Sequence, residues 1–185
     1  MLRQRGFTLF ELLIVLLIST ALLFSANHFL KPFFKRLEAQ RITDELYQLC
    51  LHGRFLAAHL KQPLALCGSK NGEQCDNRWA EGALLFIDKN RNRSVDAGEN
   101  RLQFRAFEIS PSILKWKGFG GDVLKIEAFG IPFASNGSFT YCTADKDPFY
   151  SQQIIVSRSG RVRRAPDNDG DGKREAIDGG PINCN

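Results

Sequence analysis

An apolar run at residues 7–30, interrupted by one carboxylate, constrains the fold of this chain more than any other feature. The run is long enough to cross a bilayer core of about 30 Å as a helix. Glu11, its only formal charge, costs roughly 2.5 kcal/mol or more on insertion scales. Neither a secretory signal peptide with a small-residue cleavage site at 19–21 nor a plain membrane anchor explains this charge.

A second helical pattern follows the run directly. Its stripe residues recur at alternating spacings of four and three, which is typical of one buried helix face; they are Ile42, Leu46, Leu49, Gly53, Leu56 and Leu60. We therefore expect one helix from Phe7 to about His59, bent near Pro32. Its first half is apolar all round, and its second half, 31–60, is amphipathic and packs on a domain formed by residues 61–185.

After residue 60 the pattern changes to short β-like runs divided by turns rich in Gly, Asn and Ser. The runs lie at 82–88, 101–108, 113–117, 123–129, 138–142 and 153–157. One long helix followed by a succession of strands predicts an α+β domain, with an antiparallel β-sheet packed on the amphipathic half of the helix.

The chain lacks the sequence patterns of common catalytic sites, such as G-x-S-x-G, H-E-x-x-H and a Gly-rich phosphate loop. Its three histidines, His28, His52 and His59, all fall on the predicted helix. We interpret them as helix-face residues rather than ligands. The sequence therefore predicts no enzyme and no catalytic residue.

The chain has five cysteines, and their spacings are unlike those of metal sites such as C-x2-C. In an exported chain, disulfides are then expected. Cys67 and Cys75 flank a polar loop, and we expect them to pair, with a second bond between Cys142 and Cys184. Cys50, on the predicted helix, is then an odd thiol that packs as a small apolar residue. Other pairings are also compatible with the sequence.

Two acidic stretches have the spacing of calcium loops. The first, residues 88–99, places oxygen ligands at the first, third, fifth, ninth and twelfth positions. Arg93, however, occupies the sixth position, where glycine normally makes a sharp turn. Lys89 and Arg91 add two more cationic side chains that oppose a divalent ion. We interpret this stretch as a polar hairpin between two strands.

The second acidic stretch fits the calcium pattern better. It fills the first, third, fifth, sixth and twelfth positions with Asp167, Asp169, Asp171, Gly172 and Asp178. The twelfth position normally carries a longer Glu. The flanking segments are not helical, and Asp-Gly sequences are also common in mobile turns. A calcium loop and a mobile acidic turn both remain open.

Four arginines fall within seven residues just before this stretch, with no acid among them; they are Arg158, Arg161, Arg163 and Arg164. Gly160 permits a tight reversal after the apolar strand. In an extended chain Arg161 and Arg163 point the same way, and their guanidinium groups can meet neighbouring phosphates by forked hydrogen bonds. The net charge of +5 is mild, and the acids that follow could neutralise the cluster, so a solvated basic turn remains open.

The residues Gly6-Phe7-Thr8-Leu9-Phe10-Glu11-Leu12-Leu13 resemble the leader motif of type IV prepilins and type II secretion pseudopilins. The resemblance implies a type IV pilin fold and removal of residues 1–6 by the prepilin peptidase. Cleavage between Gly6 and Phe7 is followed by N-methylation of Phe7. Glu11 would pair with the N-terminal amine of a neighbouring subunit, and a charge neutralised only in the oligomer favours assembly.

The same resemblance implies where the protein works. The segment 7–30 would hold it in the inner membrane as a single-pass protein with its C-terminal domain in the periplasm. It would later join major and minor pilins in the extracellular pilus.

A second resemblance concerns Gly160-Arg161-Val162-Arg163, which is similar to the GRxR motif near the C-terminus of FimT-like minor pilins. These pilins belong to type IV pili that capture DNA for natural transformation. The strand at 83–88, its Asn-rich turn and Gly98-Glu99 are similar to the FimT/GspH pseudopilin group. Cys142 and Cys184 suit the disulfide that brackets the arginine motif in that group.

The second resemblance implies that Arg161 and Arg163 hold DNA phosphates without reading bases, helped by Arg158, Arg164, Lys173 and Arg174. Binding by one subunit should be weak and salt-dependent, and several copies in a filament would strengthen it. The acidic stretch 167–178 departs from the family pattern, although some pseudopilins bind calcium near the C-terminus. The alternative function is a structural minor pseudopilin of type II secretion, similar to GspH, without DNA binding.

Overall fold

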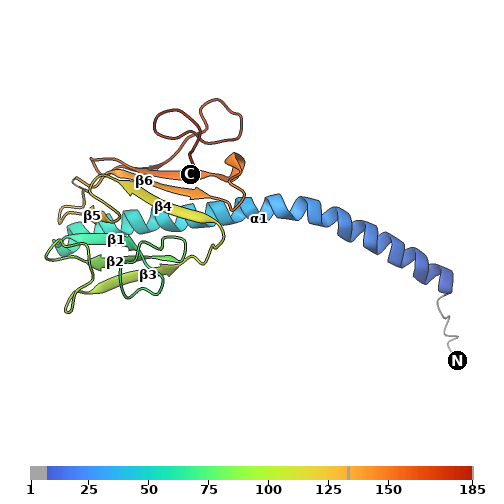
Figure 1. Cartoon of the computed structure of the whole chain (residues 1–185), viewed down its shortest axis with the longest axis horizontal. Helices are drawn as coiled ribbons and strands as arrows, with labels where there is room; N and C mark the ends of the chain where they lie inside the picture. Colours follow the sequence, from blue (N-terminus) through green and yellow to red (C-terminus); the bar gives the residue numbers. More distant parts are fainter. Residues whose placement is uncertain (1–7, 133, 185) are drawn as a thin grey trace. The chain divides into compact units, whose positions relative to one another are not determined.

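The computed structural model describes residues 8–132 and 134–184 (Figure 1). Helix α1, Leu9–Leu60, contains Pro32 in its interior. The prediction of one long helix is confirmed, and its end lies one residue beyond the expected His59. The expected start at Phe7 lies outside the described residues. Tertiary packing divides the chain into two compact units, and the boundary falls between Leu37 and Glu38.

The first unit contains the N-terminal part of α1. Its large apolar side chains are exposed, among them Leu9, Phe10, Leu13, Leu17, Leu23 and Phe24. Within the described part of the chain, no helix has the combined length and hydropathy expected of a membrane-spanning segment.

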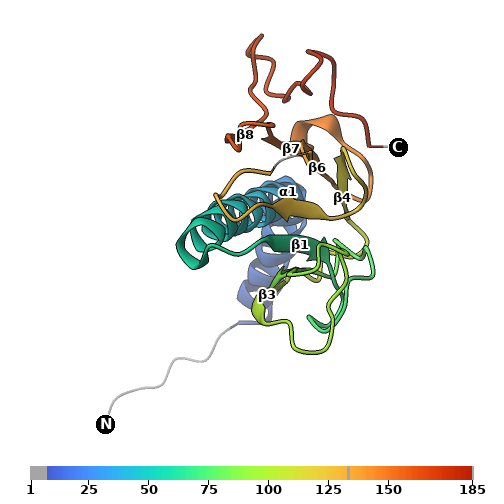
Figure 2. The same cartoon turned by 90° about the vertical axis from the view of Figure 1, so that its left-hand side faces the viewer.

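The described residues of the second unit form eight strands in two antiparallel sheets. The first sheet has the order β3-β2-β1-β5, formed by Arg101–Ala106, Gly82–Ile87, Leu64–Gly68 and Leu124–Ile126. The second has the order β4-β6-β7-β8, formed by Ile113–Gly118, Gly137–Cys142, Gln152–Val156 and Val162–Arg164. From Glu38 onward, α1 lies between the two sheets (Figure 2).

The α+β class and the antiparallel pairing are confirmed, but the strands form two sheets rather than one. The sequence does not predict β1 or β8. Every residue of β1 is buried, so it lacks the alternation of a half-exposed strand. β8 has three residues, two of them arginines, which is too short and too polar to give a strand pattern.

The buried face of α1 follows the predicted stripe for most of its length. Ile42, Leu46 and Leu49 are at most 2% exposed. They pack in one apolar core with the inner faces of both sheets. Near the end of the helix, Ala57 rather than Leu56 is fully buried, because a 3.6-residue turn drifts away from a strict 3.5-residue repeat.

At Gly53, another stripe position, the first sheet lies close to the helix. A Cβ at this position would lie 3.0 Å from Cδ1 of Ile126 and 3.1 Å from Cδ1 of Leu85. Such contacts are tighter than ordinary packing allows, so a side chain here would push β2 and β5 away from α1.

An aromatic group fills the core beside the second sheet. The ring of Phe139 lies between the rings of Trp79 and Trp116, with centroid distances of 5.0 and 4.5 Å. Phe139 and Trp79 are each 1% exposed. The indole Nε1 of Trp116 donates to the carbonyl of Gly121 (3.1 Å), which satisfies its polar end.

A partly buried polar contact joins the first turn of α1 in this unit to the second sheet. Glu38 Oε1 accepts from the hydroxyls of Tyr141 (2.5 Å) and Ser112 (2.8 Å). Burial raises the pKa of the Tyr141 phenol, and the hydrogen bond to the Glu38 carboxylate adds to the effect. The position of the helix relative to β4 and β6 is thereby fixed by polar as well as apolar contacts.

Two disulfides are present, and they join the pairs expected from the sequence. Cys67 at the end of β1 is bonded to Cys75 in the following loop, and Cys142 at the end of β6 is bonded to Cys184. Cys50 is a buried free thiol in the core. Burial raises its pKa to about 12, so it stays protonated and packs as an apolar residue.

The aromatic group generates a prediction about stability. We expect Phe139→Ala to lower the free energy of unfolding by about 3–5 kcal/mol, because it removes a fully buried ring and leaves a cavity. Urea unfolding monitored by circular dichroism measures the change. Phe119→Ala is the control, since that ring is 69% exposed and its loss should leave the urea midpoint almost unchanged. Equal midpoints for both variants would contradict the packing described here.

Candidate nucleic-acid interface

A tight turn joins β7 to β8 and carries the arginine motif. The Gly160 amide donates to the carbonyl of Ser157, and the Ser157 amide donates to the carbonyl of Arg161, both at 2.9 Å. The Ser157 hydroxyl accepts from the Arg161 amide (3.0 Å). Gly160 has a φ of +85°, a conformation that residues with a Cβ rarely adopt. Glycine therefore sets this reversal.

Arg54, from α1, packs against the turn. A Cβ on Gly160 would lie 3.0 Å from Nη2 of Arg54, so the guanidinium group lies directly on the glycine. Its Nε donates to the carbonyl of Gly130 (2.8 Å), which ties the connection between β5 and β6 to the same side chain. The sequence does not single out Arg54, because charged residues are expected along the helix away from its apolar stripe.

β8 divides the arginine cluster between the two faces of the second sheet. Val162 points into the core and is 7% exposed, so Arg163 faces the other side. Arg164 returns to the helix side, where it forms an ion pair with Asp44 and lies 5.4 Å from the ring centroid of Tyr47. The sequence groups Arg164 with Arg163, but the structure separates them and holds Arg164 against α1.

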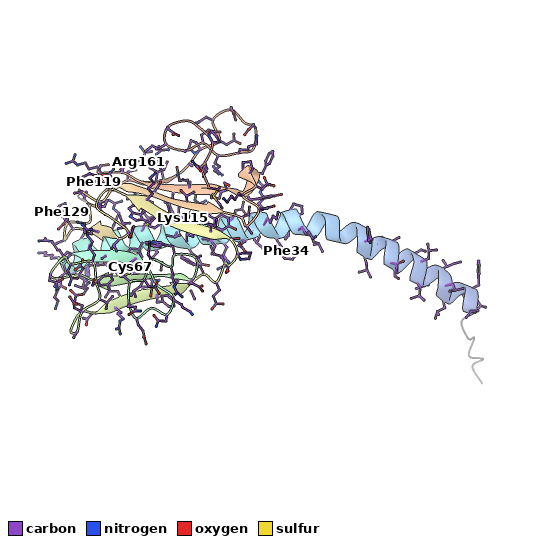
Figure 3. All side chains as sticks on the ribbon, in the orientation of Figure 1. Phe34, Cys67, Lys115, Phe119, Phe129 and Arg161 are labelled. Carbon is purple, nitrogen blue, oxygen red and sulfur yellow. A yellow bond between two sulfur atoms is a disulfide. The ribbon has the colours of Figure 1, made fainter. Side chains whose placement is uncertain are left out.

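Arg161 lies at the end of the turn, two residues before Arg163, and it is not among the residues that line the groove described below. The hydrogen bond between its carbonyl and the Ser157 amide extends the β7–β8 ladder by one residue. Arg161 is exposed and projects from the surface (Figure 3), whereas Arg163 is half-buried. Arg158, in the same turn, is exposed.

A groove runs over the outer face of the second sheet beside this turn. Lys117, Arg158 and Arg163 line it, with Asp178 as the one acidic side chain among its lining residues. Amide side chains also line it, and one of these, Gln153, is 8% exposed and donates to the hydroxyl of Thr140 (3.1 Å). The groove therefore combines an excess of positive charge with neutral hydrogen-bonding groups, which suits a phosphate backbone.

The acidic C-terminal stretch forms a separate cluster. Carboxylate oxygens of Asp167, Asp169, Asp171 and Glu175 lie within 4.8 Å of one another, and the three aspartates are exposed. Glu175 takes the place in this cluster that the sequence suggests for Asp178, which lines the groove instead. Asp167 accepts from the amides of residues 170 and 172 (2.8 and 3.0 Å), so part of its bonding capacity is used within the loop.

The two cations of this stretch contact residues within it and next to it. Lys173 forms an ion pair with Asp171 (2.6 Å) and lies 4.9 Å from the ring centroid of Phe149. The hydrogen bond from Lys173 lowers the pKa of the Asp171 carboxyl. Arg174 donates to the carbonyl of Ala165 (2.9 Å). These contacts give Lys173 and Arg174 a local structural role, and neither of them lines the groove.

Only part of the leader motif lies within the described residues. Gly6 and Phe7 lie outside the described residues. Glu11 is exposed in the first turn of α1, where its carboxylate accepts from the Thr8 amide (3.2 Å) and the Thr8 hydroxyl accepts from the Glu11 amide (3.2 Å). This is a capping box. The T-x-x-E spacing in the sequence signals it, but the interpretation of Glu11 as a docking charge overlooks it.

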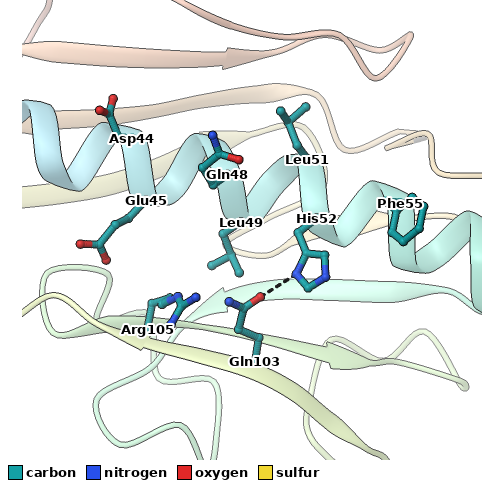
Figure 4. Close-up of a pocket in the computed structure, with 9 residues that line it drawn as sticks. All are labelled: Asp44, Glu45, Gln48, Leu49, Leu51, His52, Phe55, Gln103 and Arg105. Atoms are coloured by element: carbon teal, nitrogen blue, oxygen red, sulfur yellow. Dashed lines mark hydrogen bonds between the residues drawn. The ribbon is translucent and has the colours of Figure 1, made fainter.

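A second groove lies between α1 and β3 (Figure 4). His52 Nδ1 lies 2.8 Å from the side-chain amide of Gln103. When that amide is oriented to donate to His52, its oxygen accepts from Arg105 (2.8 and 3.1 Å). Asp44 and Glu45 also line this groove, so its charges are mixed and it suits a polyanion less well than the groove at Arg163.

The contact between Gly160 and Arg54 generates a prediction. Gly160→Ala and Gly170→Ala should each cost about 1–2 kcal/mol of stability, because both glycines have positive φ. Gly160→Ala should cost about 1 kcal/mol more, since its Cβ must displace Arg54, whereas a Cβ on Gly170 meets nothing within 4 Å. Thermal unfolding of the two variants measures the difference. Equal losses would show that Arg54 does not support the turn.

Comparison with known proteins shows which families the sequence matches. The model of the family described as Type II transport protein GspH matches residues 43–160. A model of the prokaryotic N-terminal methylation motif matches residues 1–26. No curated protein sequence gives a significant match.

Solved structures show a related fold. One crystal structure of the type IV minor pilin FimU from Pseudomonas aeruginosa is 19% identical, covering 73% of this chain and 93% of that chain with a TM-score of 0.55. A second crystal form of FimU is 17% identical, covering 69% and 92%, with a TM-score of 0.46. At this identity the likeness to the first structure establishes the pilin fold. Because the family model spans well over half of the sequence, from the second half of α1 to the turn after β7, the chain belongs to the GspH family.

Proposed function

We propose that this GspH-family protein is a FimT-like minor type IV pilin that binds extracellular DNA and supports natural transformation. The observation that carries the proposal is the placement of Arg161 and Arg163 at the end of a turn that Arg54 supports. The adjoining groove, with Lys117 and Arg158 in its lining, offers further cations to the same strand of DNA. A phosphate backbone is the ligand whose chemistry matches this surface.

The mechanism is electrostatic. Residues two apart on a strand are about 7 Å apart, so Arg161 and Arg163 can contact neighbouring phosphates through forked, charge-assisted hydrogen bonds. Such contacts carry no base information, so binding is independent of sequence. Arg164 takes no direct part, because its guanidinium group is paired with Asp44 on the other face. Several subunits in one filament would raise the overall affinity through avidity.

Processing and assembly follow the leader motif. The prepilin peptidase removes residues 1–6, and Phe7 becomes the N-methylated first residue. The exposed apolar side chains of α1 hold the chain in the inner membrane and then pack against other pilins. Glu11 exchanges its bonds to Thr8 for the N-terminal amine of a neighbouring subunit, which sets the register of assembly. The match to the methylation motif supports this sequence of events.

A second candidate function is a structural minor pseudopilin of type II secretion that does not bind DNA. One observation favours it, because the matching family model is that of a type II transport protein and ends at residue 160. The arginines from Arg161 to Arg164 thus lie outside the family match. In this alternative they contact solvent or neighbouring subunits.

A salt titration of DNA binding separates the two functions. The full chain, kept in solution with a neutral detergent, is titrated with DNA duplexes of unrelated sequence. The double variant Arg161→Ala/Arg163→Ala should weaken binding to all duplexes alike and lower the slope of log K against log salt by about 2, since two phosphate contacts are lost. Arg101→Ala/Arg105→Ala is the matched control, because it removes two exposed arginines from β3 in the other sheet.

Three outcomes of this titration separate the DNA-binding pilin from the structural pseudopilin. Loss of binding with Arg161→Ala/Arg163→Ala and retention with the β3 control supports the DNA-binding pilin. Equal weakening in both double variants would show that only total charge matters and would place no site at the turn. Absence of binding by the unmodified chain at low salt would favour the structural pseudopilin.

A further inference from the structure

The loop between β2 and β3, residues 88–99, has a property that its sequence does not reveal. Asp88 follows β2 directly and is only 2% exposed. Its Oδ2 accepts from the Arg93 amide (3.1 Å). Its Oδ1 is buried without a hydrogen-bond partner among the residues that the structure describes. A buried carboxylate oxygen in this state destabilises the fold unless a donor or a cation compensates it.

The loop closes around this carboxylate. The Arg93 amide donates to Oδ2 of Asp88 (3.1 Å), and the Arg91 amide donates to the backbone carbonyl of Asp88 (3.3 Å), so both the side chain and the backbone of Asp88 are bonded within the loop. The remaining oxygen groups fall at the third, fifth, seventh, ninth and twelfth positions counted from Asp88, the positions that bind calcium in a twelve-residue loop. They are the side chains of Asn90, Asn92, Asp96 and Glu99 and the backbone carbonyl of Ser94.

The structure removes the first objection that the sequence raises against a cation here. The sixth position of a calcium loop needs a sharp turn, which glycine normally makes. Arg93 occupies this position with a φ of +70°, so the chain makes the left-handed turn without glycine.

The second objection, an excess of positive side chains, is weakened in the same way. Arg91 Nη2 pairs with Glu127 Oε2 at 3.0 Å, beyond the end of β5. The guanidinium group of Arg93 packs on Gly121, where a Cβ would lie 2.8 Å from Nη1. Both groups are thus held by segments outside the loop, and their charges are directed away from its interior.

The polar side chains of the loop already contact one another. Asp96 Oδ2 accepts from the side-chain amides of Asn90 (2.8 Å) and Asn92 (2.6 Å). Glu99 accepts from the amides of Lys89 (2.8 Å) and Asp96 (3.2 Å), which joins the two ends of the loop. The Oδ1 atoms of Asn90 and Asn92 accept from the amides of Asn92 (3.1 Å) and Ser94 (2.8 Å). Because an amide oxygen has two lone pairs, each retains one that can bind a cation.

We propose that residues 88–99 form a calcium site in which Asp88 is the buried anchoring ligand. All the ligands would be oxygens, as a hard cation requires, and their number suits Ca²⁺ better than Mg²⁺, which keeps several waters in a strict octahedron. The expected affinity is that of extracellular calcium modules, with Kd of about 10⁻⁴–10⁻³ M. The site lies at one end of the first sheet and is independent of the proposed DNA binding by the second.

The acidic cluster at Asp167 does not offer the same argument. Its three aspartates are exposed, and solvent can compensate their charges. Asp88 differs because it is only 2% exposed and its Oδ1 has no hydrogen-bond partner among the described residues, and an uncompensated buried charge costs free energy. A cation bound at Asp88 would compensate this buried charge. A cation bound at Asp167 would stabilise the fold less, because solvent already compensates the exposed carboxylates.

Thermal unfolding of the full chain in neutral detergent tests the site with Ca²⁺ as the probe. Relative to EDTA, about 10 mM Ca²⁺ should raise the Tm of the unmodified chain by about 3–6 °C. Asp88→Asn should abolish this shift, yet in EDTA its Tm should equal or exceed that of the unmodified chain, because a buried charge is removed. A merely structural Asp88 would give a lower Tm in both conditions.

Two further variants keep the test decisive. Glu99→Gln, at a partly exposed position, should also abolish the shift and serves if Asp88→Asn does not fold. Asp167→Asn is the matched control in the other acidic loop and should keep the full shift. No shift in the unmodified chain, an equal shift with Mg²⁺, or a shift lost in Asp167→Asn but kept in Asp88→Asn would each overturn the proposal.

Discussion

The burial of one face of α1 between two sheets is the constraint on which the second unit depends. Ile42, Leu46 and Leu49 contribute to a core shared by both sheets, so the helix fixes each sheet relative to the other. The consecutive residues Gly53 and Arg54 extend this control. Gly53 sets the approach of the first sheet, and Arg54 holds the turns at Gly130 and Gly160. Core packing and the arginine turn are therefore positioned by the same helical turn.

Local patterns in the sequence predict the features that depend on residues close together in the chain. The four-and-three spacing predicts α1 and its buried stripe, and Gly160 predicts the reversal that carries the arginines. The pairing of Arg164 with Asp44 and the packing of Arg54 on Gly160 join residues more than 100 positions apart. No local pattern encodes such contacts. For the same reason, the burial of Asp88, which depends on segments packed around β2, cannot be read from a loop that looks uniformly polar.

The alternation of side chains along a strand decides on which face of the sheet each charged residue lies. Along β8, adjacent residues serve different purposes, since Val162 belongs to the core, Arg163 to the outer groove and Arg164 to the helix face. The four-arginine cluster of the sequence thus becomes a smaller set of cations on one surface. Glu11 illustrates a similar division, because the residue that we propose to pair between subunits also caps its own helix through Thr8.

The bond between Cys142 and Cys184 has a mechanical consequence. It closes a covalent loop that contains β7, β8 and the turn at Arg161. A pulling force applied at that turn would first load the short β7–β8 ladder. If the ladder opened, β8 and the C-terminal stretch would separate from β7 but would stay covalently tethered to the end of β6 through Cys142. The disulfide therefore keeps the C-terminal segment beside the second sheet after a local rupture, so that β8 can pair with β7 again once the force is released.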